Sequence, residues 1–242
     1  MSEENEKKIK MKGIIKQIYK KMGKAISDYR MIEENDRILI GFSGGVDSLS
    51  LLKLFQMRKT RILLNFDFSL CYVSANFTKV DSEVILKYFR EQKIDYTIKE
   101  LCLNGDNPDC FWCSWNRRKI LFDTARKLGC NKLALGHNLD DITETILMNL
   151  CFAGEISTMK PKLELFEGRL TIIRPLCYIE KKDLLDFVSE LNLPVVDSGC
   201  SRGKDSKRAL IKKVISEIEK DCPYLKKNIF NSLKRIKQDY LV

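Results

Sequence analysis

The residues with the clearest capacity for chemistry form the run Ser43-Gly44-Gly45-Val46-Asp47-Ser48, which follows an apolar segment and precedes an apolar helical one. Two glycines let the backbone approach a ligand closely. The N–H groups at the start of the next helix then point at an anion, which the helix dipole favours. Ser43 and Ser48 add hydroxyl donors, and Asp47 can cap the helix or bind a metal ion held with phosphates. The run predicts a phosphate-binding turn made by Ser43, Gly44, Gly45, Asp47 and Ser48, with Asp47 as a catalytic candidate. It lacks the Gly-Lys-[Ser/Thr] ending of the Walker A loop.

A second run, Leu135-Gly136-His137-Asn138-Leu139-Asp140-Asp141, stands at another expected strand–helix junction. Paired carboxylates at a helix start suit Mg²⁺ near phosphates. His137 is the only histidine of the chain. The sequence leaves open whether it positions a ligand or transfers a proton. We expect Gly136, His137, Asp140 and Asp141 to share the nucleotide site of the first run.

A third run, Cys110-Phe111-Trp112-Cys113, precedes a basic helical stretch that contains Arg117 and Arg118. Two thiolates at this spacing can share one metal ion or cluster, and a helix start with nearby arginines favours the thiolate form. Redox chemistry, an all-cysteine zinc site and an iron–sulfur cluster all fit. A single histidine argues against a mixed Cys/His zinc site. Cys200, in a polar turn, is the preferred third ligand and catalytic candidate with Cys110 and Cys113, although spacing alone does not exclude Cys177 or Cys222.

Strand-like and helix-like segments alternate along the chain. The pattern predicts strands at residues 37–42, 70–75, 96–101, 132–136 and 170–174, and helices at 5–30, 49–55, 81–93, 115–129, 140–152, 181–191 and beyond 206. Such alternation indicates an α/β fold with a doubly wound parallel sheet, whose ligands lie at the carboxyl ends of the strands. We expect a basic helical arm (1–34), a catalytic domain (35–203) and a basic helical tail (204–242).

The formal charge of +10 is concentrated at the two ends of the chain. Residues 1–30 contain nine Lys/Arg against four Asp/Glu, and residues 200–242 contain twelve against five. Basic ends around a near-neutral middle favour a polyanionic partner such as nucleic acid. No apolar run suits a signal peptide or a membrane span, and nine cysteines without a secretory context argue against a disulfide framework. The expected location is the cytoplasm.

Together these residues resemble the tRNA 2-thiocytidine synthetase (TtcA) family of the PP-loop ATP pyrophosphatase superfamily. The resemblance covers residues 35–210 and includes Met159-Lys160-Pro161-Lys162-Leu163 and Ile173-Arg174-Pro175-Leu176. It implies a PP-loop fold and cleavage of ATP to AMP and pyrophosphate. It also implies adenylation of an anticodon-loop cytidine, giving 2-thiocytidine, and a [4Fe–4S] cluster held by Cys110, Cys113 and Cys200 with one iron free to carry sulfur. Members of the family carry a second Cys-x-x-Cys where this chain has only Cys200.

The implied partners are tRNA, Mg²⁺ with ATP, and a sulfur donor such as a cysteine desulfurase or sulfide, and the enzyme could be a homodimer. Three other functions fit part of the pattern. One is a different PP-loop reaction on tRNA, such as lysidine synthesis, which needs no cluster. Another is sulfur insertion into a small-molecule acceptor, which leaves the basic ends unused. The third is a zinc-bound RNA-binding module that consumes no ATP.

Overall fold

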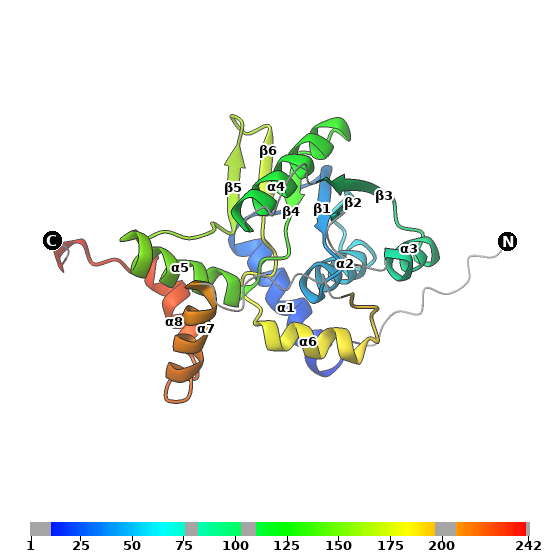
Figure 1. Ribbon diagram of the computed structural model, residues 1–242. Coiled ribbons are helices and arrows are strands. Elements are labelled where there is room, and N and C mark those ends of the chain that lie inside the picture. Colours follow the sequence, from blue (N-terminus) through cyan, green and yellow to red (C-terminus); the bar gives the residue numbers. More distant parts are fainter. Residues whose placement is uncertain (1–10, 76–81, 103–109, 197–206, 241–242) are drawn as a thin grey trace.

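The computed structural model describes residues 11–75, 82–102, 110–196 and 207–240. In this part of the chain six strands form one sheet in the order β3-β2-β1-β4-β6-β5 (Figure 1). The strands are β1 (Asp36–Phe42), β2 (Phe66–Ala75), β3 (Tyr96–Leu101), β4 (Lys132–Ala134), β5 (Lys162–Leu165) and β6 (Leu170–Ile173). All neighbours pair in parallel except β5, which pairs antiparallel with β6 at the edge.

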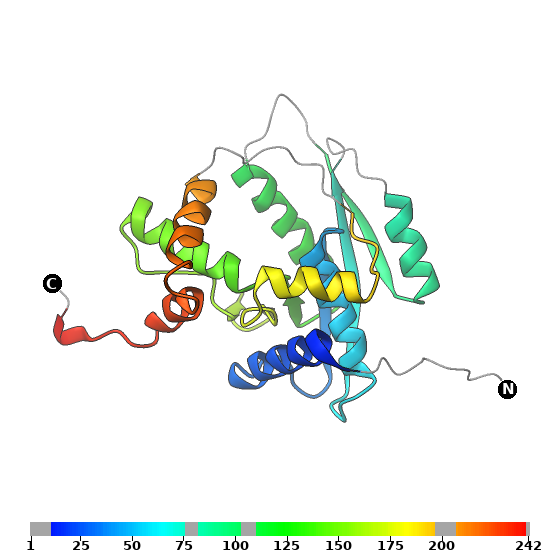
Figure 2. The same ribbon diagram turned by 90° about the horizontal axis from the view of Figure 1, so that it is seen from below.

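Helices cover both faces of the sheet because its central strands are apolar on both sides. In β1, Ile38 and Ile40 face one core and Leu39 faces the other, as expected for alternating side chains. The larger core contains residues of α1 (Gly13–Asp28), α2 (Val46–Lys59), α3 (Ser82–Glu91), α5 (Leu139–Ala153) and α6 (Lys181–Glu190). The smaller core lies under α4 (Cys110–Lys127), on the opposite face of the sheet (Figures 1 and 2).

The C-terminal helices pack beside α5 rather than on the sheet. They are α7 (Lys207–Ile218) and α8 (Leu225–Ser232), followed by a short 3₁₀ turn (Gln238–Tyr240). Figure 1 shows both helices at the end of the molecule where α5 lies. Within the described residues, no helix is long and apolar enough to cross a membrane.

The strand order turns around at β1, which fixes where a ligand can bind. The chain moves outward from β1 through β2 to β3, and then returns to place β4 on the other side of β1. The loops after β1 and β4 therefore leave in different directions, and a crevice opens between them at the carboxyl ends of these strands. The two loops are residues 43–48, here called the phosphate turn, and residues 136–141, here called the carboxylate loop.

The predicted fold class is confirmed, with local differences. Strand β5 was not predicted, because it is a short edge strand that exists only by pairing with β6. Helix α4 begins at Cys110 rather than near residue 115, so the Cys-x-x-Cys run forms its first turn. Helix α1, which lies in the segment expected to form a basic arm, contributes Ile18 and Met22 to the larger core. The predicted division into three segments stays a prediction.

Candidate nucleotide site

The phosphate turn is closed by hydrogen bonds between its own serines. The hydroxyl of Ser48 donates to the carbonyl of Gly45 at 3.0 Å and accepts the backbone N–H of Ser43 at 3.2 Å. Gly44 has φ +86°, which side chains disfavour. Gly45 is the N-cap of α2 and offers no side chain to the first N–H groups of the helix. The turn therefore leaves the first N–H groups of α2 without a side-chain cap, a geometry that suits an anion, and its phosphate-binding role stays a prediction.

The carboxylate loop is built on a capping box at the start of α5. Asn138 accepts the Asp141 N–H through Oδ1, and Asp141 accepts the Asn138 N–H through Oδ2, both at 3.1 Å. Asn138 also donates its amide Nδ2 to Oδ1 of Asp47 at 3.0 Å. A Cβ atom at Gly136 would lie 3.1–3.2 Å from atoms of Asp47 and Ser48. Glycine at this position lets the two loops touch, and the asparagine joins them.

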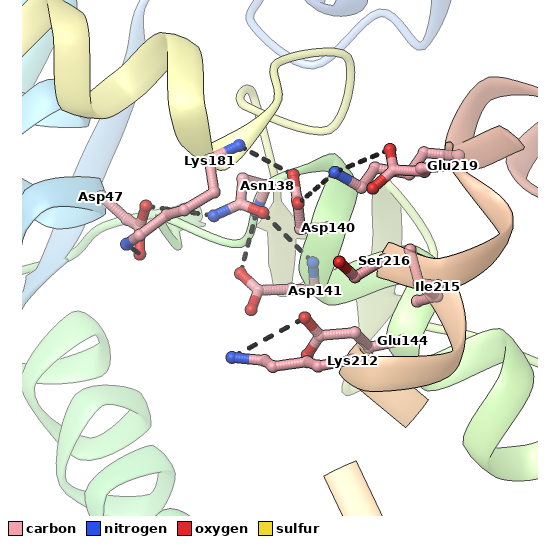
Figure 3. Close-up of a pocket in the computed structure, with 11 residues that line it drawn as sticks. Asp47, Asn138, Asp140, Asp141, Glu144, Lys181, Lys212, Ile215, Ser216 and Glu219 are labelled. Atoms are coloured by element: carbon pink, nitrogen blue, oxygen red, sulfur yellow. Dashed lines mark hydrogen bonds and ion pairs between the residues drawn. The ribbon is translucent and has the colours of Figure 1, made fainter. Parts of the chain in front are cut away.

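Lys181, the first residue of α6, binds both loops (Figure 3). Its Nζ lies 2.7 Å from Asp47 Oδ2, and its backbone N–H donates to Asp140 Oδ2 at 2.7 Å. The other oxygen of Asp140 lies 2.8 Å from the Nζ of Lys226. Burial raises the pKa of Asp141, and the negative charge of Asp47 adds to this effect. Lys181 thus joins Asp47 to Asp140, whereas Asp141 is held by Asn138.

Two cavities meet at these carboxylates, and Asp47 and Asp141 line both of them. The smaller, of about 290 Å³, lies between the phosphate turn, the carboxylate loop and α4, where Ser114, Arg117 and Arg118 contribute to its wall. The larger, of about 450 Å³, lies between α5, α6, α7 and α8. Figure 3 shows its lining side chains.

His137 lies between the smaller cavity and a buried arginine. Its Nδ1 accepts a hydrogen bond from Nε of Arg174 at 3.0 Å. Burial, with the charges of Arg174, Arg118 and Arg208, lowers the pKa of His137 to about 3. The imidazole is therefore neutral at physiological pH, and because Nδ1 accepts, its proton is on Nε2. This arrangement suits a hydrogen-bond donor and disfavours proton transfer near pH 7.

The comparisons with known proteins agree with this geometry. A family model described as a PP-loop domain matches residues 11–218. The tRNA-cytidine(32) 2-sulfurtransferase of Geobacter sulfurreducens is 33% identical, over 94% of this chain and 92% of that protein. The protein of the same name from Syntrophotalea carbinolica is also 33% identical, over 95% and 92%. This chain belongs to the tRNA-cytidine(32) 2-sulfurtransferase family of PP-loop proteins. The resemblance seen in the sequence is confirmed.

Solved structures support the PP-loop fold. The U34-tRNA thiolase NcsA from Methanococcus maripaludis, solved with its [4Fe-4S] cluster, superposes with a TM-score of 0.76 at 24% identity. The match covers 95% of this chain and 80% of that one. The NH3-dependent NAD synthetase of Campylobacter jejuni matches with a TM-score of 0.51 at 13% identity, over 95% of each chain. At these identities the likeness concerns the fold.

The structure describes only part of the predicted cysteine site of this PP-loop chain. Cys113 is half-buried in the first turn of α4, and Cys110 begins that helix, although its side chain lies outside the described residues. Cys200 also lies outside them. The described residues contain no group of three possible metal ligands. Cys177 is fully buried, and burial raises the pKa of its thiol to about 12, which argues against it as a thiolate ligand.

Several residues at the site were not predicted as site residues. Asn138 and Arg174 lie in the sequence runs 135–141 and 173–176, but their contacts depend on residues 91 and 37 positions away. Lys181 could have been found, since it follows the strand-end loop of β6 at the carboxyl edge of the sheet. No sequence motif indicated that Lys226 belongs to the site, because it lies in α8, a separate helix of the basic tail.

The neutral state of His137 gives a direct prediction, since it is the chain's only histidine. Its imidazole resonance should not titrate between pH 8 and 5 in the folded protein, whereas in urea it should titrate near 6.5. Because the folded pKa is lowered, folding loses stability as the pH falls below about 6.5. Between pH 7 and 5 the unfolding free energy should drop about 1–2 kcal/mol more than in His137→Gln. A folded-state midpoint near 6.5 would contradict the described environment.

Proposed function

We propose that this chain adenylates a cytidine in the anticodon loop of tRNA with ATP and replaces the C2 oxygen of that base with sulfur. The observation that carries the proposal is the contact between the phosphate turn and the carboxylate loop. It places Asp47 and Asp141 beside helix N–H groups that suit phosphates. The relatives are named for sulfur transfer to cytidine 32 of tRNA, which supports tRNA cytidine as the acceptor and sulfur as the transferred atom.

The reaction divides into two displacements. The C2 oxygen of cytidine attacks the α-phosphorus of ATP, and the bond to the pyrophosphate oxygen breaks. Sulfide then adds at C2, the C2–O bond breaks, and AMP leaves with that oxygen. The N–H groups of the phosphate turn bind the β- and γ-phosphates, and the ammonium of Lys181, which pairs with Asp47, stabilises the pyrophosphate that leaves. The neutral His137 donates Nε2–H within the cavity.

A magnesium ion fits Asp47 and Asp141 better than Asp140. Asp140 lines only the larger cavity, whereas Asp47 lines the smaller one as well. Asp141 accepts its capping bond through Oδ2 and lines both cavities. Asp47 and Asp141 would hold the ion, which would supply positive charge to the phosphates of ATP and would compete with the Lys181 ammonium for Asp47. Hard oxygen ligands of this kind, completed by phosphate oxygens and water, are what Mg²⁺ prefers.

The first turn of α4 fits a cluster. Cys110 and Cys113 are three residues apart on a helix and therefore lie on one face, at an end whose dipole favours thiolates. The backbone N–H of Val196, four positions before Cys200, donates to the carbonyl of Gly44 at 3.1 Å. This contact brings the end of the described segment that leads toward Cys200 to the phosphate turn. Cys110, Cys113 and Cys200 would hold a [4Fe–4S] cluster, and such a cluster would supply an iron without a protein ligand for the sulfur. The sulfur donor, sulfide or a cysteine desulfurase, and assembly as a homodimer remain predictions.

The exposed face of α4 suits the tRNA substrate. Trp115 is 58% exposed and Trp112 is 36% exposed, so neither tryptophan belongs to the core. Both flank Cys113 in sequence, and Arg118 is exposed on the same helix. Aromatic rings and arginine planes hold unstacked RNA bases. The basic tail offers less positive charge to tRNA than its sequence predicted. Arg208 and Lys212 of α7 already pair with Glu144, at 3.6 and 3.8 Å.

The ATP chemistry is tested by the products that the protein forms with tRNA. The wild type should release AMP and pyrophosphate. Asp47→Asn and Asp141→Asn should slow this release about 100-fold or more, because each removes charge from the site of the transferring phosphates. Asp186→Asn, on the exposed side of α6, is the control and should match the wild type. Release of ADP and orthophosphate by the wild type would rule out the adenylation step.

The cluster is tested by iron content and colour after anaerobic purification. The protein should be brown and contain about four irons per chain. Replacing Cys110, Cys113 or Cys200 with serine should remove the colour and the thiolation activity. The buried thiols Cys71 and Cys130, whose pKa values burial raises, are controls, and serine there should retain the iron. A colourless zinc protein with full activity would overturn this part of the proposal.

The α4 surface is tested by the substitution Trp115→Ala. Base stacking on an aromatic ring contributes about 1–3 kcal/mol, so the Kd for tRNA should rise about 5- to 150-fold. The Kd for ATP should stay within about twofold of the wild-type value. Leu63→Ala is the control, since Leu63 is fully exposed in the loop before β2, at the amino end of the sheet. Equal tRNA affinities for the two variants would place the RNA surface elsewhere.

A further inference from the structure

Lys226 connects the C-terminal helix α8 to the carboxylate loop. Its side chain is only 13% exposed. Its Nζ lies 2.8 Å from Asp140 Oδ1, 3.1 Å from Glu219 and 3.9 Å from Glu180. Glu219 follows α7, and Glu180 is the N-cap of α6. One ammonium group thus joins the starts of α5 and α6 to the turn between α7 and α8. Figure 3 shows Asp140 and Glu219 near each other among the side chains that line the larger cavity.

The electrostatic surroundings of Lys226 require its charge. Burial acts to lower the pKa of Lys226, but Asp140 and Glu219 outweigh burial and leave that pKa above its ordinary value. Three carboxylates gathered without this cation would repel one another, and removing one partner of a buried pair is strongly unfavourable. The lysine is therefore a charged member of the cluster at the pH of the cell.

The contacts of Asp140 connect Lys226 and its carboxylate partners to the phosphate turn. Lys226 holds one oxygen of Asp140, and the backbone N–H of Lys181 occupies the other at 2.7 Å. The Nζ of Lys181 in turn pairs with Asp47. Asp140 thus sets where α6 begins, and the start of α6 sets where the Lys181 ammonium reaches the phosphate turn.

We propose that Lys226 is a positioning residue of the nucleotide site, which orients Asp140 and through it Lys181. The inference rests on the proposed function, and it makes α8 part of the ATP site. This helix lies beyond residues 11–218, the span that the PP-loop domain model matches. Partners that orient groups at a metal or phosphate site typically change affinity or activity about 10- to 100-fold when they are removed.

The test compares Lys226→Met with Lys227→Met, its exposed neighbour on the same helix, in cluster-loaded protein. Two quantities are measured: the Kd for a non-hydrolysable ATP analogue by calorimetry, and the KM for ATP in tRNA-dependent pyrophosphate release. Lys226→Met should raise both about tenfold or more and leave the Kd for tRNA within about twofold. Lys227→Met should leave all three unchanged. Equal analogue affinities for the two variants would overturn the inference.

Two milder variants decide the question if Lys226→Met does not fold. Lys226→Arg keeps the charge but changes the shape of the donor, and should raise the KM for ATP about three- to tenfold with little change in Tm. Glu219→Gln removes a partner that does not touch Lys181, and should lower Tm without changing that KM. Equal KM values in these two variants would overturn the positioning role. If the wild type itself releases no pyrophosphate with tRNA, the proposed function fails instead.

Discussion

The hydrogen bond from Asn138 to Asp47 is the contact on which the site depends. It joins the loop after β4 to the loop after β1, which are neighbours in space and 91 residues apart in the chain. A hydrogen bond to a charged group contributes about 1.5–3 kcal/mol. The contact is possible because Gly136 has no side chain and β4 pairs in parallel with β1. Without it, among the residues that the structure describes, Lys181 alone would bridge the phosphate turn and the carboxylate loop through hydrogen bonds to Asp47 and Asp140.

The same contact gathers negative charge, and the basic residues of the later chain balance it. Asp47, Asp140, Asp141 and Glu144 lie around one cavity. Burial disfavours the charged forms of Asp141 and Glu144 and so raises their pKa values. Nearby cations oppose this effect and favour the ionised carboxylates. The cations come from α6, α7 and α8. The basic tail is thus partly a set of counterions for the site, and only its remaining charge is available for RNA.

The parts of the site that the sequence could predict are those whose chemistry is local. The phosphate turn needs a strand, two glycines and a helix start, all within a dozen residues, and the capping box of the carboxylate loop is similarly local. The fold class followed from alternating apolar segments. Contacts made across the fold were not predictable: the neutral state of His137 depends on its burial and on Arg174, and the orientation of Asp140 depends on α8. Strand β5 was missed for the same reason, since only its pairing with β6 defines it.

The central claim is that sulfur reaches a tRNA base through an ATP-dependent step at this site. It is tested most directly by mass spectrometry of the nucleosides of tRNA from cells that lack the protein. The account predicts that 2-thiocytidine disappears, that the wild-type chain restores it, and that a chain carrying Asp47→Asn does not. If every thiolated nucleoside of tRNA persists at its normal level in cells without the protein, tRNA is not the acceptor and the account is wrong.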